Sequence, residues 1–308
     1  TTTRATELVR DVFEAPEAAV YFVATGTAAN ALILGTLANP WETVFTGRAS
    51  HAHEDECNAP EFFTGGAKLT LVGEDDAKFS GAELRAAIER EETRGVHGPQ
   101  RGPVSFTTVS ERGHVYGLDD IRDICDVAKA HDLPVHLDGA RFANACAALD
   151  CSAADMTWKA GVNAVSFGGT KNGCMGVEAV VFFDPKHAWE FELRRKRGAH
   201  LFSKGRYLGA QMVGYLEDGL WLDMARAANA KADRLRAGLD AAGGDYCWRG
   251  TANMTFPKLT AAQHTRAEAA FQRMPSRKSL RSLTQLQAKP EVSRSPRPVS
   301  LRPDLINP

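Results

Sequence analysis

The sequence predicts an α/β fold with a mostly parallel sheet, and three observations support this prediction. Short apolar runs typical of strands alternate with amphipathic segments typical of helices, and glycine turns follow several of these runs. Parallel strands need a crossover connection, usually a helix, so the alternation indicates βαβ units. With 308 residues, 44% of them apolar, the chain can form a full core in one large domain plus a smaller one.

Composition and charge argue against several classes of partner. Lys and Arg number 37 against 38 Asp and Glu, so the net charge gives no bias toward nucleic acid or an acidic membrane surface. Six cysteines are scattered without CxxC pairs, which predicts reduced thiols in a cytoplasmic protein. No apolar run approaches the roughly 20 residues of a membrane helix, and residues 1–10 do not resemble a signal peptide. We therefore expect a small-molecule ligand.

The first strand and helix suggest a phosphate-binding turn. Residues 4–13 place apolar side chains on one helical face, and the run AVYFVA at 19–24 suits a strand. The turn TGTAAN and a helical segment follow. Gly26 lets the backbone approach a ligand, while a helix N-terminus offers free N–H groups and a positive dipole end. The same residues also make ordinary tight turns, so this motif alone leaves a structural role open.

A loop rich in histidine and acid follows the next strand, which is expected at 43–46. In GRASHAHEDECNAPEFF, the possible metal ligands include His51, His53 and the acids at 54–56. We weigh three interpretations: a divalent-ion site of a metal-dependent hydrolase, a solvated charged loop, or His51 stacking on a cofactor ring. No second strand-end histidine pair follows to complete a metal shell, so we expect no metal.

The alternation continues through the rest of the chain. Further strands are expected over 68–73, 103–110, 134–138, 163–168 and 178–183. One expected helix begins at the capping box Ser80–Glu83 and another at Asp119 or Asp120. Two more are expected over 155–161 and over 212–239, the latter with a buried leucine stripe. His136 shares a strand face with Asp138 and is expected to be a core histidine.

Two strand ends carry the strongest chemical signal. Asp138 and Arg141 follow the strand in PVHLDGARFANA, and Lys171 follows the strand in NAVSFGGTKNG. In an open α/β sheet, the carboxyl ends of strands face the ligand crevice. An acid that keeps a pyridine nitrogen protonated and a lysine that forms a Schiff base suit pyridoxal 5'-phosphate (PLP). We therefore predict a PLP site here.

We expect three segments, of which composition sets the last one apart. We expect a large PLP-binding domain at 1–209, the start of a small C-terminal domain at 210–258, and a tail at 259–308. The tail holds nine Lys or Arg, three Asp or Glu, and six Pro. Such a basic, proline-rich segment predicts a poorly ordered or weakly helical terminus, with contact to nucleic acid or an acidic surface as the other interpretation.

Together these motifs resemble the low-specificity L-threonine aldolases, among the fold-type-I PLP enzymes. The resemblance covers roughly residues 6–257 and rests on FVATGTAAN, DECNAPEFFTGGAKL, PVHLDGARFANA, SFGGTKNG and RRKRGAHLFSK, in the family's order. It implies a seven-stranded, mostly parallel sheet flanked by helices, with a small, incomplete C-terminal domain. It also implies cleavage of L-threonine, L-allo-threonine and related β-hydroxy-α-amino acids to glycine and an aldehyde, in a cytoplasmic homodimer or homotetramer with shared active sites.

The same resemblance assigns roles to the catalytic residues. It implies that Lys171 is the Schiff-base lysine and that Asp138 pairs with the pyridine nitrogen. Arg141 is expected near the ring oxygen. His51 is expected to stack on the ring close to the reacting bond, where it, or a water that it orients, removes the β-hydroxyl proton.

Phosphate contacts and departures complete the comparison with the family. Gly26 and Thr27 are implied as phosphate ligands, and Lys204 and Arg206 as phosphate contacts across a subunit boundary. Family members usually begin with a Ser-Asp-Asn segment and end with a carboxylate-binding arginine in a strand, and neither is found here. The histidine of some members is Glu111. Two alternatives therefore stay open: a truncated or diverged PLP-binding homologue without catalysis, and elimination or racemisation on the same cofactor.

Overall fold

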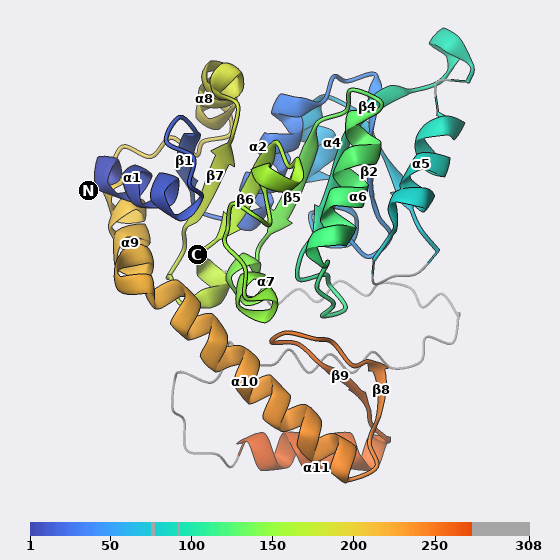
Figure 1. Ribbon diagram of the computed structural model, residues 1–308, viewed down its shortest axis with the longest axis vertical. Helices are drawn as coiled ribbons and strands as arrows, with labels where there is room; N and C mark the ends of the chain where they lie inside the picture. Colours follow the sequence, from blue (N-terminus) through green and yellow to red (C-terminus); the bar gives the residue numbers. More distant parts are fainter. Residues whose placement is uncertain (75–77, 92, 273–308) are drawn as a thin grey trace, which may run out of the picture.

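The computed structural model describes residues 1–74, 78–91 and 93–272 (Figure 1). Its main sheet consists of β1 (Ala19–Val23), β2 (Glu42–Gly47), β3 (Lys68–Val72), β4 (Gln100–Thr107), β5 (Val135–Gly139), β6 (Ala164–Gly168) and β7 (Glu178–Phe182). The seven strands lie in the order β1-β7-β6-β5-β4-β2-β3. In this sheet β7 runs against both of its neighbours, and the other pairings are parallel. The predicted mostly parallel sheet is confirmed.

Helices cover both faces of the sheet (Figure 1). One layer contains α1 (Thr2–Val12), α5 (Gly81–Arg90), α6 (Leu118–Lys129), α7 (Phe142–Leu149), α9 (Arg206–Leu216) and α10 (Leu220–Ala241). The other contains α2 (Gly26–Leu37), α4 (Ala59–Thr64) and α8 (Ala188–Arg197), with α4 packed on α2. Both faces of the sheet are therefore buried, which explains why its strands are apolar almost throughout.

Strand alternation places the polar residues of β5 on one face. Val135 and Leu137 belong to the core under the first helix layer, whereas Asp138 contacts α2 of the second layer. His136 points to the same side as Asp138, because side chains two apart in a strand share a face. It is fully buried and lies between two serine hydroxyls, which confirms the expected core histidine.

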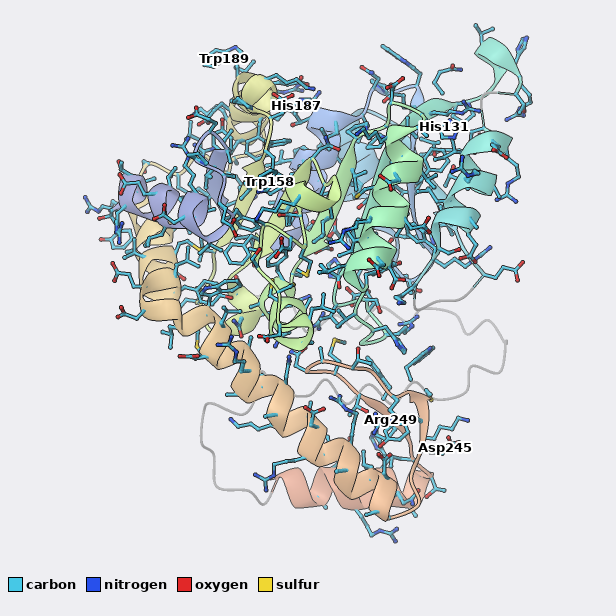
Figure 2. The ribbon with its side chains drawn as sticks, in the orientation of Figure 1. His131, Trp158, His187, Trp189, Asp245 and Arg249 are labelled. Atoms are coloured by element: carbon cyan, nitrogen blue, oxygen red, sulfur yellow. The ribbon has the colours of Figure 1, made fainter. Side chains whose placement is uncertain are left out.

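A smaller unit follows the main sheet. The long helix α10 leads to β8 (Asp245–Trp248), β9 (Phe256–Lys258) and α11 (Ala261–Gln272) (Figure 1). Arg249 donates to Asp240 of α10 at 2.7 Å, near Asp245 in the same unit (Figure 2). The backbone N–H of Thr251 donates to the oxygen of Gly113 at 2.8 Å, so this unit contacts the loop that follows β4.

Of the expected tail at 259–308, α11 occupies 261–272, and residues 273–308 lie outside the described residues. No helix in the described ranges combines the length and the apolar character that a membrane crossing requires.

Two predicted helices need correction. The expected helix at 212–239 is divided between α9 and α10, because Asp218 and Gly219 adopt φ values of 56° and 72° that cannot continue a helix. The helix expected at 155–161 is only a 3₁₀ turn over Trp158–Ala160, ended by Gly161 at a φ of 107°.

The expected apolar stripe is only partly confirmed: Leu216 is buried and Met224 packs against the core. Leu220 and Leu235 are exposed, and α10 instead buries Trp221 and the small side chains Ala225 and Ala232. Small residues let α10 approach α7, its main helical neighbour, and leucine at these positions would hold the helices apart.

Candidate active site

The ends of β5 and β6 bring the predicted acid and lysine to one edge of the sheet. Asp138 is the penultimate residue of β5, and Lys171 lies in a 3₁₀ turn (Thr170–Asn172) just after β6. Glycine permits this close approach. A Cβ on Gly139 would lie 2.7 Å from the backbone oxygen of Ser166, and one on Gly168 would lie 2.5 Å from the backbone oxygen of Ala140.

The Lys171 side chain is exposed and carries no hydrogen bond or ion pair among the described residues. Its turn is held by Glu178, whose Oε2 accepts the backbone N–H of Gly169 at 2.8 Å. Burial raises the pKa of Glu178 to about 7, while the Lys171 charge acts to lower it and the Asp138 charge to raise it. These three charged groups therefore act on one another at the same edge of the sheet.

Asp138 is a buried carboxylate held by two donors. Its Oδ2 accepts from the Asn30 side-chain amide at 2.9 Å, and its Oδ1 accepts from the Ala140 backbone at 3.0 Å. The side chain is only 4% exposed. An acid fixed in this way can present a lone pair to a cationic ring nitrogen without moving.

His51 begins the short helix α3 (His51–Glu54) and is half-buried. Its Nδ1 lies 2.8 Å from Glu56 Oε1. The hydrogen bond to Glu56 raises the pKa of His51, burial opposes this rise, and the charges of Asp138 and Glu111 support it. His51 therefore shares the electrostatic environment of Asp138.

The two histidines of the HAH motif differ in their surroundings. His53 is exposed, whereas His51 faces Glu56. Within 1–74, 78–91 and 93–272, no group of three or more His, Cys, Asp or Glu side chains is placed to hold a metal ion. The geometry therefore gives the metal-dependent hydrolase interpretation no support.

Arg141 follows β5 and pairs with Glu111, which lies in the loop after β4. The closest charged atoms are 4.0 Å apart, and both side chains are largely buried. The Glu111 charge also raises the pKa of His51, so Glu111 acts on both Arg141 and His51.

The predicted phosphate turn forms the start of α2. Thr25 caps this helix by accepting the Ala28 N–H at 3.2 Å, and Gly26 and Thr27 are its first two residues. A Cβ built on Gly26 would meet nothing within 4 Å, so this end of the helix is open to a ligand. An open helix N-terminus suits a phosphate group.

Lys204 and Arg206 are exposed on the single chain. Arg206 lines a cavity of about 300 Å³ with Phe22, Arg195 and His200. Phe22 belongs to β1, the strand before the phosphate turn. Among the described hydrogen bonds and ion pairs, neither Lys204 nor Arg206 contacts the region of Asp138 and Lys171.

A second cavity, of about 720 Å³, lies at the opposite edge of the sheet. It is lined by residues at the amino ends of β5 and β6 and by Trp158 and His187 (Figure 2). None of the predicted site residues lines it. Volume alone therefore does not identify the functional site in this chain.

Four residues of this site were not predicted from the sequence, namely Asn30, Glu56, Ser166 and Glu178. Asn30 had a signal: it is a polar residue in an apolar helix, and burial demands that its amide find partners. Glu56 had none, because three acids stand in a row in that loop. Ser166 and Glu178 look like ordinary strand residues in the sequence. Only the folded chain shows that Ser166 bonds Asn30 and that Glu178 bonds the backbone of Gly169.

Comparison with known proteins identifies the family. Residues 1–262 match the beta-eliminating lyase family. The low specificity L-threonine aldolase of Pseudomonas sp. is 42% identical over 235 residues, covering 76% of this chain and 67% of that protein. The one from Pseudomonas aeruginosa is 42% identical over 229 residues, covering 74% and 65%. The chain thus spans about two thirds of the length of these relatives.

A solved structure extends the likeness to the fold. Threonine aldolase from Leishmania major superposes with a TM-score of 0.82 at 27% identity, over 87% of this chain and 77% of that chain. The chain therefore belongs to the beta-eliminating lyase family, and it is similar to threonine aldolases in both sequence and fold.

Proposed function

We propose that this protein binds PLP and cleaves L-threonine, L-allo-threonine and related β-hydroxy-α-amino acids to glycine and an aldehyde. The observation that supports this most is the placement of Asp138 and Lys171 at neighbouring strand ends, with His51 tied to the same acid through Glu56 and Asn30. The threonine aldolases among the relatives point the same way.

The residues present fit the cofactor. Lys171 would be its covalent attachment point, and Asp138 would face its pyridine nitrogen. Gly26 and Thr27 would receive its phosphate at the start of α2, and Arg141 would lie near its ring oxygen. When bound, PLP supplies an electron sink for the substrate's Cα, which no side chain can provide.

The chain's own residues supply binding and proton transfer. Asp138, buried and held by two donors, would keep a positive charge on the ring nitrogen favourable. His51 would act as the base that takes the β-hydroxyl proton, since its pKa is raised and its ring is anchored. Glu111 would hold the Arg141 guanidinium in place.

A product assay tests this proposal. Purified protein is incubated with PLP and L-threonine, acetaldehyde is followed with alcohol dehydrogenase, and glycine is measured by mass spectrometry. We expect equal amounts of acetaldehyde and glycine. Formation of 2-oxobutanoate would show elimination instead, and bound PLP without either product would show a homologue that binds the cofactor but does no chemistry.

We also propose that the protein is a cytoplasmic homodimer or homotetramer with sites shared between subunits. Lys204 and Arg206 support this, because both are exposed and neither forms a described hydrogen bond or ion pair with the Asp138 and Lys171 region of its own chain. We propose the domain division 1–209, 210–258 and 259–308, and the change in composition supports the start of the last segment. Sedimentation of the protein with and without PLP tests the oligomeric state, and a monomer that binds PLP fully would contradict it.

A further inference from the structure

A continuous hydrogen-bond network crosses three strands of the main sheet. Ser105 Oγ of β4 lies 3.0 Å from His136 Nδ1 of β5, and His136 Nε2 lies 2.9 Å from Ser166 Oγ of β6. Ser166 Oγ in turn lies 2.7 Å from Asn30 Oδ1 of α2. All four side chains are at most 3% exposed, so water does not replace these contacts.

Beyond Asn30 the network branches to two acids. The Asn30 amide nitrogen lies 2.9 Å from Asp138 Oδ2 and 2.8 Å from Glu56 Oε1. Glu56 Oε1 also lies 2.8 Å from His51 Nδ1. The predicted base and the predicted acid are thus joined through Glu56 and Asn30.

The direction of each hydrogen bond follows from the two acids. A carboxylate only accepts, so the Asn30 group between Glu56 and Asp138 must be its NH₂, and its carbonyl must face Ser166. The Ser166 hydroxyl donates its only hydrogen to that carbonyl, so it must accept a hydrogen bond from His136 Nε2–H. His136 Nδ1 then accepts from the Ser105 hydroxyl. Burial lowers the pKa of His136 to about 4, in keeping with a neutral ring.

The same reasoning fixes the His51 tautomer. Its Nδ1 faces a carboxylate oxygen that already accepts from Asn30, so Nδ1 carries the hydrogen and Nε2 is the nitrogen left to titrate. Glu56 is 3% exposed, and its second oxygen has no hydrogen-bond partner among the described residues. Burial and the nearby Asp138 charge raise the pKa of Glu56, whereas the hydrogen bonds from His51 and Asn30 lower it and so favour the carboxylate.

We propose that Glu56 is a positioning residue for the reaction, which holds His51 by its Nδ1–H while Asn30 ties the Glu56 carboxylate to Asp138. The inference rests on the proposed function, since it gives His51 the role of base. An orienting carboxylate behind an imidazole keeps the second nitrogen basic and stabilises the imidazolium that forms when a proton is taken. Here Glu56, the orienting acid, and Asp138, which would face the ring nitrogen of PLP, both accept hydrogen bonds from the side-chain amide of Asn30.

The charged groups that face His51 come from three elements. Glu56 lies in the loop after α3, Asp138 on β5 and Glu111 in the loop after β4. All three favour the protonated ring, and burial of the ring opposes them. Glu56 is the one that touches His51, so its charge can be removed without altering the other two.

The first test reads the tautomer of His51 in the wild-type protein, and a substitution serves only to assign its signals. The full chain is labelled with ¹⁵N-histidine, its spectrum is recorded across pH before and after addition of PLP, and the His51 signals are assigned with His51→Gln. We expect neutral His51 to carry its hydrogen on Nδ1. A hydrogen on Nε2 in the neutral ring would overturn the proposal.

The second test compares Glu56→Gln with Glu54→Gln. The first substitution keeps the shape of the side chain but removes its charge, so we expect a lower His51 pKa and an acidic limb of the kcat profile shifted to lower pH. We also expect a kcat loss of about 10- to 100-fold with little change in KM. Glu54 has the same charge and lies on the same short helix as His51, but it pairs with Arg112 at 3.6 Å, so its variant should match wild type. Equal pH profiles for the two variants would overturn the proposal.

The outcomes separate this inference from the proposed function. The histidine spectra do not depend on turnover, so a protein that releases no acetaldehyde can still show the Nδ1–H tautomer, and then only the function fails. A protein that releases acetaldehyde with His51 in the other tautomer keeps its function and loses the proposed network. If the Glu56→Gln variant does not fold, the tautomer of His51 in the wild-type protein still tests the proposed role of Glu56.

Discussion

The backbone N–H of Gly169 donates to the buried carboxylate of Glu178 at 2.8 Å, two residues before Lys171. This bond ties the turn after β6 to the neighbouring antiparallel strand β7, where Gly168 and Glu178 are paired. The lysine that we propose as the attachment point of PLP is thus held through its backbone, while its side chain stays exposed.

Glu178 should make stability fall as pH rises. Its ordinary pKa is 4.5 and burial raises it to about 7 in the folded chain, so between these values the folded protein binds a proton that the unfolded chain has released. The free energy of unfolding should therefore fall by about 3 kcal/mol from pH 4.5 to about 7 relative to Glu178→Gln. Urea unfolding at several pH values measures this difference.

The control for that experiment is Glu17→Gln, because Glu17 is exposed near the start of β1. Its difference from wild type should stay nearly constant over the same pH range. A Glu178→Gln difference that is equally flat would show that Glu178 titrates near its ordinary pKa.

The close approach of β5 and β6 predicts a large effect of one methyl group. Gly168→Ala would place a Cβ 2.5 Å from the Ala140 oxygen, so we expect a loss of about 1–3 kcal/mol and weaker PLP binding through displacement of the Lys171 turn. Gly214→Ala on the exposed side of α9 has open space and should stabilise by about 0.5–1 kcal/mol. Unfolding curves compare the two, and similar behaviour would contradict the packing argument.

The charge of Asp138 should support both PLP binding and catalysis. Asp138→Asn keeps an acceptor for Asn30 but loses the negative charge that favours a protonated ring nitrogen. We expect PLP to bind more weakly and kcat to fall by about 10²–10³-fold. Steady-state assays of acetaldehyde release measure this, with the surface variant Asp184→Asn as control; an unchanged kcat would exclude the proposed role of Asp138.

Lys171 should be required for covalent attachment of PLP. Lys171→Ala removes the amine, so the visible absorbance of lysine-bound cofactor should disappear, whereas Lys186→Ala, whose amine pairs with Asp184 at the surface, should keep it. Absorbance spectra of both variants after gel filtration provide the measurement. Retained absorbance in Lys171→Ala would move the attachment point to another lysine.

The fold and the strand-end residues were accessible from the sequence because each depends on local pattern. Asp138 and Lys171 follow apolar runs bounded by glycine, and the topology rule for open sheets then places both at one edge. Asn30 could have been found as a lone amide in an apolar helix, but its two acid partners are 26 and 108 residues away. Local pattern carries no information on such distant contacts.

Glu56 could not have been chosen over its neighbours by pattern. Three acids stand at 54–56, and the backbone turns sharply after them, with φ values of 51° at Cys57 and 60° at Asn58. That turn buries Glu56 and leaves Glu54 and Asp55 exposed. The leucine stripe at 212–239 was only partly right: Leu216 is buried, but α10 packs on α7 through its small residues and leaves Leu220 and Leu235 exposed.

The central claim is that PLP is held at the carboxyl ends of β5 and β6, and borohydride trapping tests it most directly. The protein is incubated with PLP, reduced with sodium borohydride, digested and mapped by mass spectrometry. We expect one phosphopyridoxyl group per chain, on the peptide that contains Lys171. A label on another lysine, or none at saturating PLP, would contradict the account.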